Sequence, residues 1–216
     1  MNLAPRPRAV LFDYGGVFTG PTFSAVDVLA QDLGTSSEVL FRVFLGSYEA
    51  DTDHPWHQLE RGEIDLATAH REIDQLCNDA GLKVDLPSLL IAMASTAGIR
   101  EDMVALTREV RAAGVLTALV TNNLAEFRSH WRRSLPLDEL FDVVIDSSEV
   151  GIRKPNPAIF HLTLERLGVE DPAAALFLDD FHGNIKAARS VGLHGILVEP
   201  DPAPAMAEVR RLVLGS

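Results

Sequence analysis

Three carboxylates of this sequence stand directly after short apolar runs. Asp13 follows AVLF at residues 9–12, and Asp179 and Asp180 follow AALFL at residues 174–178. A turn after a strand could use asparagine or serine instead, so the question is what these carboxylates meet. Carboxylates can act as nucleophiles and can bind hard cations, and either chemistry needs suitable groups to converge.

Hydroxyl, amide and ammonium groups stand at comparable places. Thr121 and Asn122 follow the apolar run at residues 116–120, and Lys154 lies in the loop GIRKPNP, which its two prolines keep stiff and extended. Taken singly, each has an ordinary structural interpretation, because Thr121 could cap a helix and Lys154 could be a surface lysine. Their joint occurrence at the ends of successive apolar runs favours a shared site.

The elements that would position these groups alternate between strand and helix. Apolar runs predict strands over residues 9–12, 116–120, 141–145, 174–178 and 195–198. Apolar spacings of three and four predict helices that include residues 103–110, 157–167 and 184–191. This order predicts an α/β fold, with a Rossmann-like parallel sheet flanked by helices and right-handed crossovers. In such a sheet, ligands bind outside the carboxyl ends of the strands.

The segment between the first two strands has a different rhythm. Its apolar residues recur at helical spacing, for example at Leu66, Ala69, Ile73 and Leu76, and glycines and a proline break it into several helices. We therefore expect a helical domain over residues 21–97, inserted into an α/β core domain formed by residues 1–20 and 98–216.

Four segments together resemble the sequence motifs of the haloacid dehalogenase superfamily of hydrolases. FDYGGV at residues 12–17 is similar to the first motif, LVTNN at 119–123 to the second, IRKPNPAIF at 152–160 to the third, and FLDDFHGN at 177–184 to the fourth. The helical insertion resembles the small cap domain of this superfamily, and LERGEID at residues 59–65 is similar to a segment of its capped phosphatases.

The resemblance implies a nucleophile and a metal. Asp13 matches the nucleophile, which would form an aspartyl phosphate, and Mg²⁺ is the implied cofactor. The implied protein ligands are Asp13, Asp180 and the backbone carbonyl of Gly15, with Asp179 as a further ligand or as a support for the ligands. Lys154 would offset the remaining negative charge and steady Asp13.

The resemblance also implies how a phosphoryl group is held. Its oxygens would bind the Thr121 hydroxyl and the backbone N–H groups of Gly15, Gly16 and Asn122. Without side chains, the glycine pair lets the backbone approach the phosphate closely. The expected function is a Mg²⁺-dependent phosphatase of a small phosphorylated metabolite, whose identity the cap residues do not reveal.

Gly15 departs from the motif, because phosphatases of this superfamily usually carry a second aspartate there as general acid and base. Losing such a group typically costs roughly 10²–10⁴-fold in rate. Three alternatives follow: a 2-haloacid dehalogenase, a catalytically weak or non-catalytic binding protein, or a phosphatase that takes its proton from cap residues such as His54 or His57. The aromatic residues Phe181 and Trp56 are interpreted as packing residues, as is Trp131.

The composition restricts the classes of molecule that the protein could bind. The 216 residues include 31 acidic and 19 basic ones, a net charge of −12, which argues against nucleic acid or an anionic membrane as partner. Cys77 is the single cysteine, and no apolar run is long enough for a transmembrane helix, so we expect a cytoplasmic protein with a small-molecule substrate. The oligomeric state stays open.

Overall fold

The computed structural model describes residues 6–21, 24–94 and 98–215. Within them a five-stranded sheet has the order β3-β2-β1-β4-β5, and each neighbouring pair is parallel. The strands are β1 (Ala9–Phe12), β2 (Leu116–Thr121), β3 (Val143–Asp146), β4 (Ala175–Asp179) and β5 (His194–Leu197). The α/β fold with a parallel sheet is confirmed.

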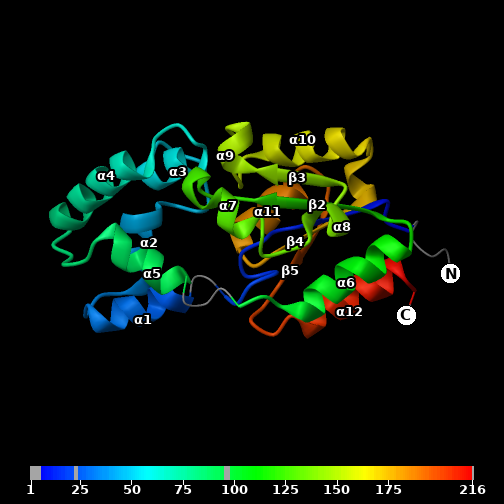
Figure 1. Ribbon diagram of the computed structural model, residues 1–216, viewed down its shortest axis with the longest axis horizontal. Helices are drawn as coiled ribbons and strands as arrows, with labels where there is room; N and C mark the ends of the chain where they lie inside the picture. Colours follow the sequence, from blue (N-terminus) through cyan, green and yellow to red (C-terminus); the bar gives the residue numbers. More distant parts are fainter. Residues whose placement is uncertain (1–5, 22–23, 95–97, 216) are drawn as a thin grey trace.

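Helices cover both faces of the sheet (Figure 1). Alternate residues of a strand point to opposite faces. Val10 and Phe12 accordingly pack in an apolar cluster with α6 (Glu101–Ala112) and α12 (Ala203–Val213). Ala9 and Leu11 pack in a second cluster with α10 (Pro157–Leu167) and α11 (His182–Ser190). The first strand is therefore buried on both faces.

Five helices follow β1 and form a separate apolar cluster, which includes Leu40, Phe44 and Ile73. They are α1 (Ser24–Asp32), α2 (Ser37–Leu45), α3 (Pro55–Glu60), α4 (Leu66–Asp79) and α5 (Leu86–Ala94). Side chains cap three of them: Ser36 accepts a hydrogen bond from the Val39 N–H, Asp65 accepts one from the Thr68 N–H, and His54 caps α3. Figure 1 shows these helices at one end of the molecule and both chain termini at the other.

The two connections between this helical unit and the sheet run side by side. The backbone N–H of Arg100 donates to the Phe18 carbonyl over 2.8 Å, and the Gly20 N–H donates to the Gly98 carbonyl over 3.2 Å. The expected domain junctions fall at or beside residues 22–23 and 95–97, which lie outside the described residues. The boundaries of the two domains therefore stay a prediction.

The structure differs from the expected elements mainly between the second and fourth strands. The strand expected at 141–145 begins at Val143, because residues 137–140 form a short helix, α8 (Leu137–Leu140), that the Phe141 N–H closes on the Leu137 carbonyl. Sequence reasoning did not predict the short helices α7 (Arg128–Trp131) and α9 (Ser147–Val150), or the 3-10 turns η1 (Ala125–Phe127) and η2 (Pro172–Ala174). Among the described residues, none of the helices has the length and apolar character needed to cross a bilayer.

Candidate active site

The three central strands end at neighbouring points of one sheet edge. Asp13 follows β1 directly, Thr121 is the last residue of β2, and Asp179 is the last residue of β4. Strand β1 lies between the other two, and the Asp13 N–H donates to the Leu178 carbonyl over 2.9 Å, which extends the β1–β4 pairing to the aspartate itself. The sheet register thus brings residues 166 positions apart to one place.

Lys154 joins two of these carboxylates. Its Nζ lies 2.6 Å from Asp13 Oδ1 and 2.7 Å from Asp179 Oδ2, and the side chain is 1% exposed. Burial by itself lowers the pKa of Lys154, but the charges of Asp13 and Asp179 outweigh burial, so its pKa is raised and the ammonium form is favoured. The lysine and both acids therefore converge as the motifs led us to expect.

Asp179 is fully buried, and both of its carboxylate oxygens are occupied by protein donors. Oδ1 accepts hydrogen bonds from the Phe181 N–H and from Asn184 Nδ2, and Oδ2 accepts from Asn184 Nδ2 and from Lys154. With this many partners, Asp179 is suited to orienting its neighbours rather than to binding an incoming cation. Asn184 Oδ1 is buried and has no hydrogen-bond partner among the described residues.

Asp13 and Asp180 carry the charge that Lys154 does not balance. Burial raises the pKa of Asp13 from 3.8 to about 7, with Lys154 opposing and Asp179 adding to the shift. Burial and the charges of Asp179 and Asp13 likewise raise the pKa of Asp180 well above its usual value. Each shift reports the cost of crowding carboxylates in a place with little water.

This acid cluster fits a divalent cation. Asp13, Asp179 and Asp180 each offer an oxygen that lies within 4.8 Å of those of the others. With all three carboxylates ionised beside one ammonium, the cluster has a formal charge of −2, which a divalent ion would neutralise, and an all-oxygen donor set suits Mg²⁺. Asp13 and Asp180 are the better candidate ligands, because protein donors already occupy Asp179.

Gly15 and Gly16 have different surroundings. A cavity opens at the carboxyl ends of the strands, and Gly15 belongs to its lining, whereas Gly16 does not. Gly16 has a positive φ of 69°, and a Cβ atom there would lie 1.9 Å from Asp180 Oδ2. Its N–H donates to Thr19 Oγ1 over 3.1 Å, so this amide serves the turn instead of facing the cavity as the sequence led us to expect. Gly16 provides room for Asp180.

Asn122 and Thr121 also differ in their surroundings. The Asn122 side chain accepts a hydrogen bond from the Lys154 N–H over 2.8 Å and donates to the Lys154 carbonyl over 2.9 Å. This pair of bonds ties the end of β2 to the lysine loop, so the side chain positions Lys154. Thr121 is 1% exposed and lines the cavity beside Asp13 and Lys154.

A cavity of about 520 Å³ opens above this cluster, with residues of both the sheet unit and the helical unit in its lining. Its polar part includes Asp13, Thr121, Lys154 and Asp180. Phe181, Trp56 and Trp131 pack in the apolar clusters as the sequence indicated, and they also line this cavity.

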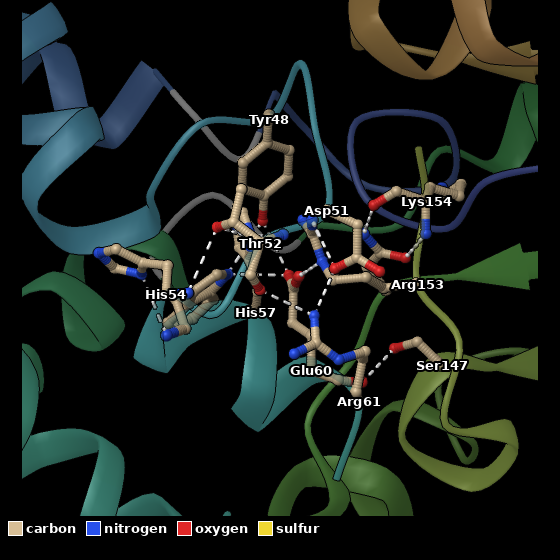
Figure 2. A network of polar contacts seen from close by, with 12 residues as sticks. Tyr48, Asp51, Thr52, His54, His57, Glu60, Arg61, Ser147, Arg153 and Lys154 are labelled. Atoms are coloured by element: carbon tan, nitrogen blue, oxygen red, sulfur yellow. Dashed lines mark hydrogen bonds and ion pairs between the residues drawn. The ribbon is translucent and has the colours of Figure 1, made fainter. Parts of the chain in front are cut away.

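A buried network connects the helical unit to the loop that carries Lys154 (Figure 2). Glu60, the last residue of α3, accepts a hydrogen bond through Oε2 from Arg153 Nε over 2.6 Å. Its Oε1 accepts from the Tyr48 hydroxyl and from Trp56 Nε1, each over 2.8 Å. The Glu60 carbonyl also accepts from Ser147 Oγ over 2.6 Å.

Sequence reasoning missed this network. The segment LERGEID was singled out only as a resemblance, and Arg153 received no role although it directly precedes Lys154. The Arg153 guanidinium is fully buried and lies over the Tyr48 ring at 4.9 Å. An arginine and a glutamate 93 positions apart give no local signal that they meet.

His54 and His57, considered as proton donors, lie elsewhere. Neither belongs to the described lining of the cavity. His54 Nδ1 accepts a hydrogen bond from the Trp56 N–H and so caps α3. His57 is fully buried, and burial together with the charge of Arg153 lowers its pKa to about 3. A histidine held neutral in this way is not in the imidazolium form that acts as a general acid at neutral pH.

Comparison with known proteins identifies the family of the chain. A family model described as haloacid dehalogenase-like hydrolase matches residues 7–192. Acyl-CoA dehydrogenase family member 10 of Mus musculus is 34% identical over 212 residues, which are 95% of this chain and 19% of that protein. The sesquiterpene phosphatase astK of Aspergillus oryzae is 30% identical over 221 residues, covering 95% of this chain and 96% of that one.

A solved structure supports the fold. The HAD family enzyme of Bacteroides thetaiotaomicron, in complex with magnesium and inorganic phosphate, superimposes with a TM-score of 0.60 at 21% identity. The match covers 90% of this chain and 96% of that enzyme.

Proposed function

The chain belongs to the haloacid dehalogenase-like hydrolases, and from this membership we propose that it is a Mg²⁺-dependent phosphatase that uses Asp13 as its nucleophile. The observation that carries the proposal is the cluster of Asp13, Asp179, Asp180 and Lys154 at the carboxyl edge of the sheet, whose formal charge is −2 when all three carboxylates are ionised. A relative named as a phosphatase that matches over nearly its full length supports the same reaction class.

The residues of the cluster have distinct parts in the proposed reaction. An Asp13 oxygen attacks the phosphorus, the bond to the ester oxygen breaks, and an aspartyl phosphate forms. The departing alkoxide takes a proton from solvent water and leaves as the alcohol, because Gly15 supplies no acid. Lys154 holds Asp13 in place through its 2.6 Å contact and offsets charge on the phosphoryl group. The Thr121 hydroxyl and the N–H groups of Gly15 and Asn122 are proposed to donate to the phosphoryl oxygens. Water then hydrolyses the aspartyl phosphate and releases Asp13.

Asp13, Asp180 and the Gly15 carbonyl are proposed to hold the metal, and Asp179 to support them through Lys154 and Asn184. When bound, Mg²⁺ would neutralise the charge that otherwise opposes the approach of a phosphate dianion to a carboxylate. Asn184 Oδ1, a buried acceptor with no partner in the described structure, is available to a donor bound at this site.

The dehalogenase alternative uses the same nucleophile and needs no leaving-group acid, which suits Gly15. It gives no reason for a cluster with a net charge of −2, because a haloacid brings a further negative charge to the site. The acid cluster therefore favours the phosphatase.

Phosphate release from a panel of phosphomonoesters, including 4-nitrophenyl phosphate, tests the proposal. We expect turnover with Mg²⁺, its loss in excess EDTA, and its return when Mg²⁺ is restored. Chloride release from 2-chloropropionate that is insensitive to EDTA would instead establish the dehalogenase. A folded, Mg²⁺-loaded protein without activity on either panel would favour a binding protein.

A further inference from the structure

The cavity above the acid cluster has a polar end and a larger apolar part. Asp13, Lys154 and the other strand-end groups form the polar end. The apolar part includes Leu90 and Met93 from α5 and Leu124, Phe127 and Trp131 from the segment after β2. The volume of about 520 Å³ falls within the range of pockets that enclose a whole organic ligand.

Three aromatic residues of the cavity lining, Tyr14, Tyr48 and Trp56, carry polar atoms that are already hydrogen-bonded within the protein. The Tyr48 hydroxyl and Trp56 Nε1 both donate to Glu60 Oε1, and Arg153 occupies Oε2 of the same carboxylate. The Tyr14 hydroxyl is 2.8 Å from Ser134 Oγ. Because the protein itself satisfies these polar atoms, the three aromatic residues contribute mainly ring carbon to a ligand.

The charges of the cavity allow one phosphate group. Among its described lining residues, Lys154 is the only lysine or arginine, and it already contacts Asp13 and Asp179. A second phosphate or a carboxylate on the substrate would meet no lysine or arginine in the apolar part, where the one imidazole among the described lining residues is that of the exposed His130. Outside the polar end, the described lining offers a sugar few side-chain partners, chiefly Asn123 and His130, so most of its hydroxyl groups would face apolar side chains.

We propose that the substrate is the phosphate monoester of a bulky apolar alcohol, of long-chain or terpenoid type, whose hydrocarbon part fills the space beside Leu90, Leu124, Phe127 and Trp131. This inference rests on the proposed phosphatase function and adds the class of the leaving group. The apolar part binds the alcohol, and the acid cluster with Lys154 receives its phosphate.

A series of primary alkyl monophosphates from ethyl to decyl tests the inference, with glucose 6-phosphate beside it and Mg²⁺ throughout. All alkyl members release a primary alcohol, so differences in kcat/KM report the effect of the length of the alkyl group. We expect kcat/KM to rise about two- to fourfold per added methylene until the cavity is filled. A flat series, or glucose 6-phosphate turned over as efficiently as decyl phosphate, would overturn the inference.

Two neighbouring residues of α5 supply a matched pair of variants. Leu90 lines the cavity, whereas Ile91 is 72% exposed and does not. We expect Leu90→Ala to lower the ratio of kcat/KM for decyl over ethyl phosphate about tenfold, since one large apolar contact is lost. Ile91→Ala should leave that ratio at the wild-type value. Equal ratios in the two variants would count against the assignment.

Calorimetric binding of the same esters to Asp13→Asn separates the two proposals. Affinity that grows with chain length, without hydrolysis of any ester by the wild type, would remove the phosphatase and keep the apolar ligand class. Hydrolysis without dependence on chain length would do the reverse. Neither hydrolysis nor chain-dependent binding would remove both.

Discussion

Glu60 and Arg153 form a buried ion pair, with Oε2 and Nε 2.6 Å apart, across 93 positions of the chain. Glu60 is 2% exposed and Arg153 is fully buried. The next residue, Lys154, pairs with Asp13 and Asp179. Two consecutive basic residues of one loop therefore bind different parts of the protein: Arg153 binds the helical unit, and Lys154 binds the acid cluster.

Replacing Glu60 should destabilise the protein strongly. Glu60→Ala removes the hydrogen-bonded counter-charge of the buried Arg153 guanidinium and leaves only Asp51, 3.8 Å from Nη1, so we expect the free energy of unfolding in urea to fall by about 3–5 kcal/mol. Glu139→Ala is the matched control, because Glu139 pairs with Arg108 on the surface, and it should unfold close to the wild type. The double variant Glu60→Leu, Arg153→Met should recover much of the loss, since neither charge remains. Equal losses in Glu60→Ala and Glu139→Ala would contradict this role.

Asp13→Asn should remove turnover while the fold persists. An amide cannot form the aspartyl phosphate, so we expect kcat for phosphate release to drop by about 10⁴-fold or more. The variant takes one carboxylate out of a cluster with excess negative charge, so its melting temperature should equal or exceed that of the wild type. Activity retained in the purified variant would refute the assignment of the nucleophile.

Gly16→Ala should impair the site more than its backbone strain alone would. Gly16 and Gly34 share a left-handed conformation, with φ of 69° and 65°, so either alanine costs about 1 kcal/mol of stability. Only at Gly16 does the new methyl group meet a side chain, with Asp180 Oδ2 at 1.9 Å, whereas at Gly34 nothing lies within 4 Å. We expect kcat/KM to fall about 10²-fold in Gly16→Ala and to stay at the wild-type value in Gly34→Ala. Similar activity in both variants would show that Asp180 tolerates displacement.

The buried His57 predicts a dependence of stability on pH. Its pKa is about 3 in the folded protein against 6.5 when solvated, so the unfolded chain binds more protons between these values. The stabilisation is complete above pH 6.5 and is lost as the pH falls toward 3. His57→Asn, which keeps an acceptor for the Thr52 N–H, should give a shallower decline of unfolding free energy between pH 6.5 and 5. His161→Asn, on the exposed side of α10, should follow the wild type, and an unchanged slope in His57→Asn would contradict the shift.

Much of the site was predictable because it depends on strand ends. Each apolar run predicted a buried strand, and parallel pairing then places Asp13, Thr121 and Asp179 at one edge whatever lies between them. The cofactor, the roles of these residues and the absence of nucleic-acid or membrane partners stay predictions, as does the cytoplasmic location.

The rest depended on contacts between distant segments. The sequence could not indicate that the Gly16 N–H is used by Thr19, or that the Asn122 amide binds the backbone of Lys154. Likewise, Leu90 and Phe127 carry ordinary apolar signals in their own segments. They line one cavity because the helical unit packs against the segment after β2, which no local pattern encodes.

The buried position of Arg153 has a consequence for engineering new selectivity. Exchanging the helical unit for one from another enzyme would leave this guanidinium buried without the Glu60 carboxylate, unless the new unit placed a carboxylate opposite it. A transplant that ignored this requirement would disturb the adjacent ammonium as well, and a chimera could lose catalysis through a residue that never touches the substrate.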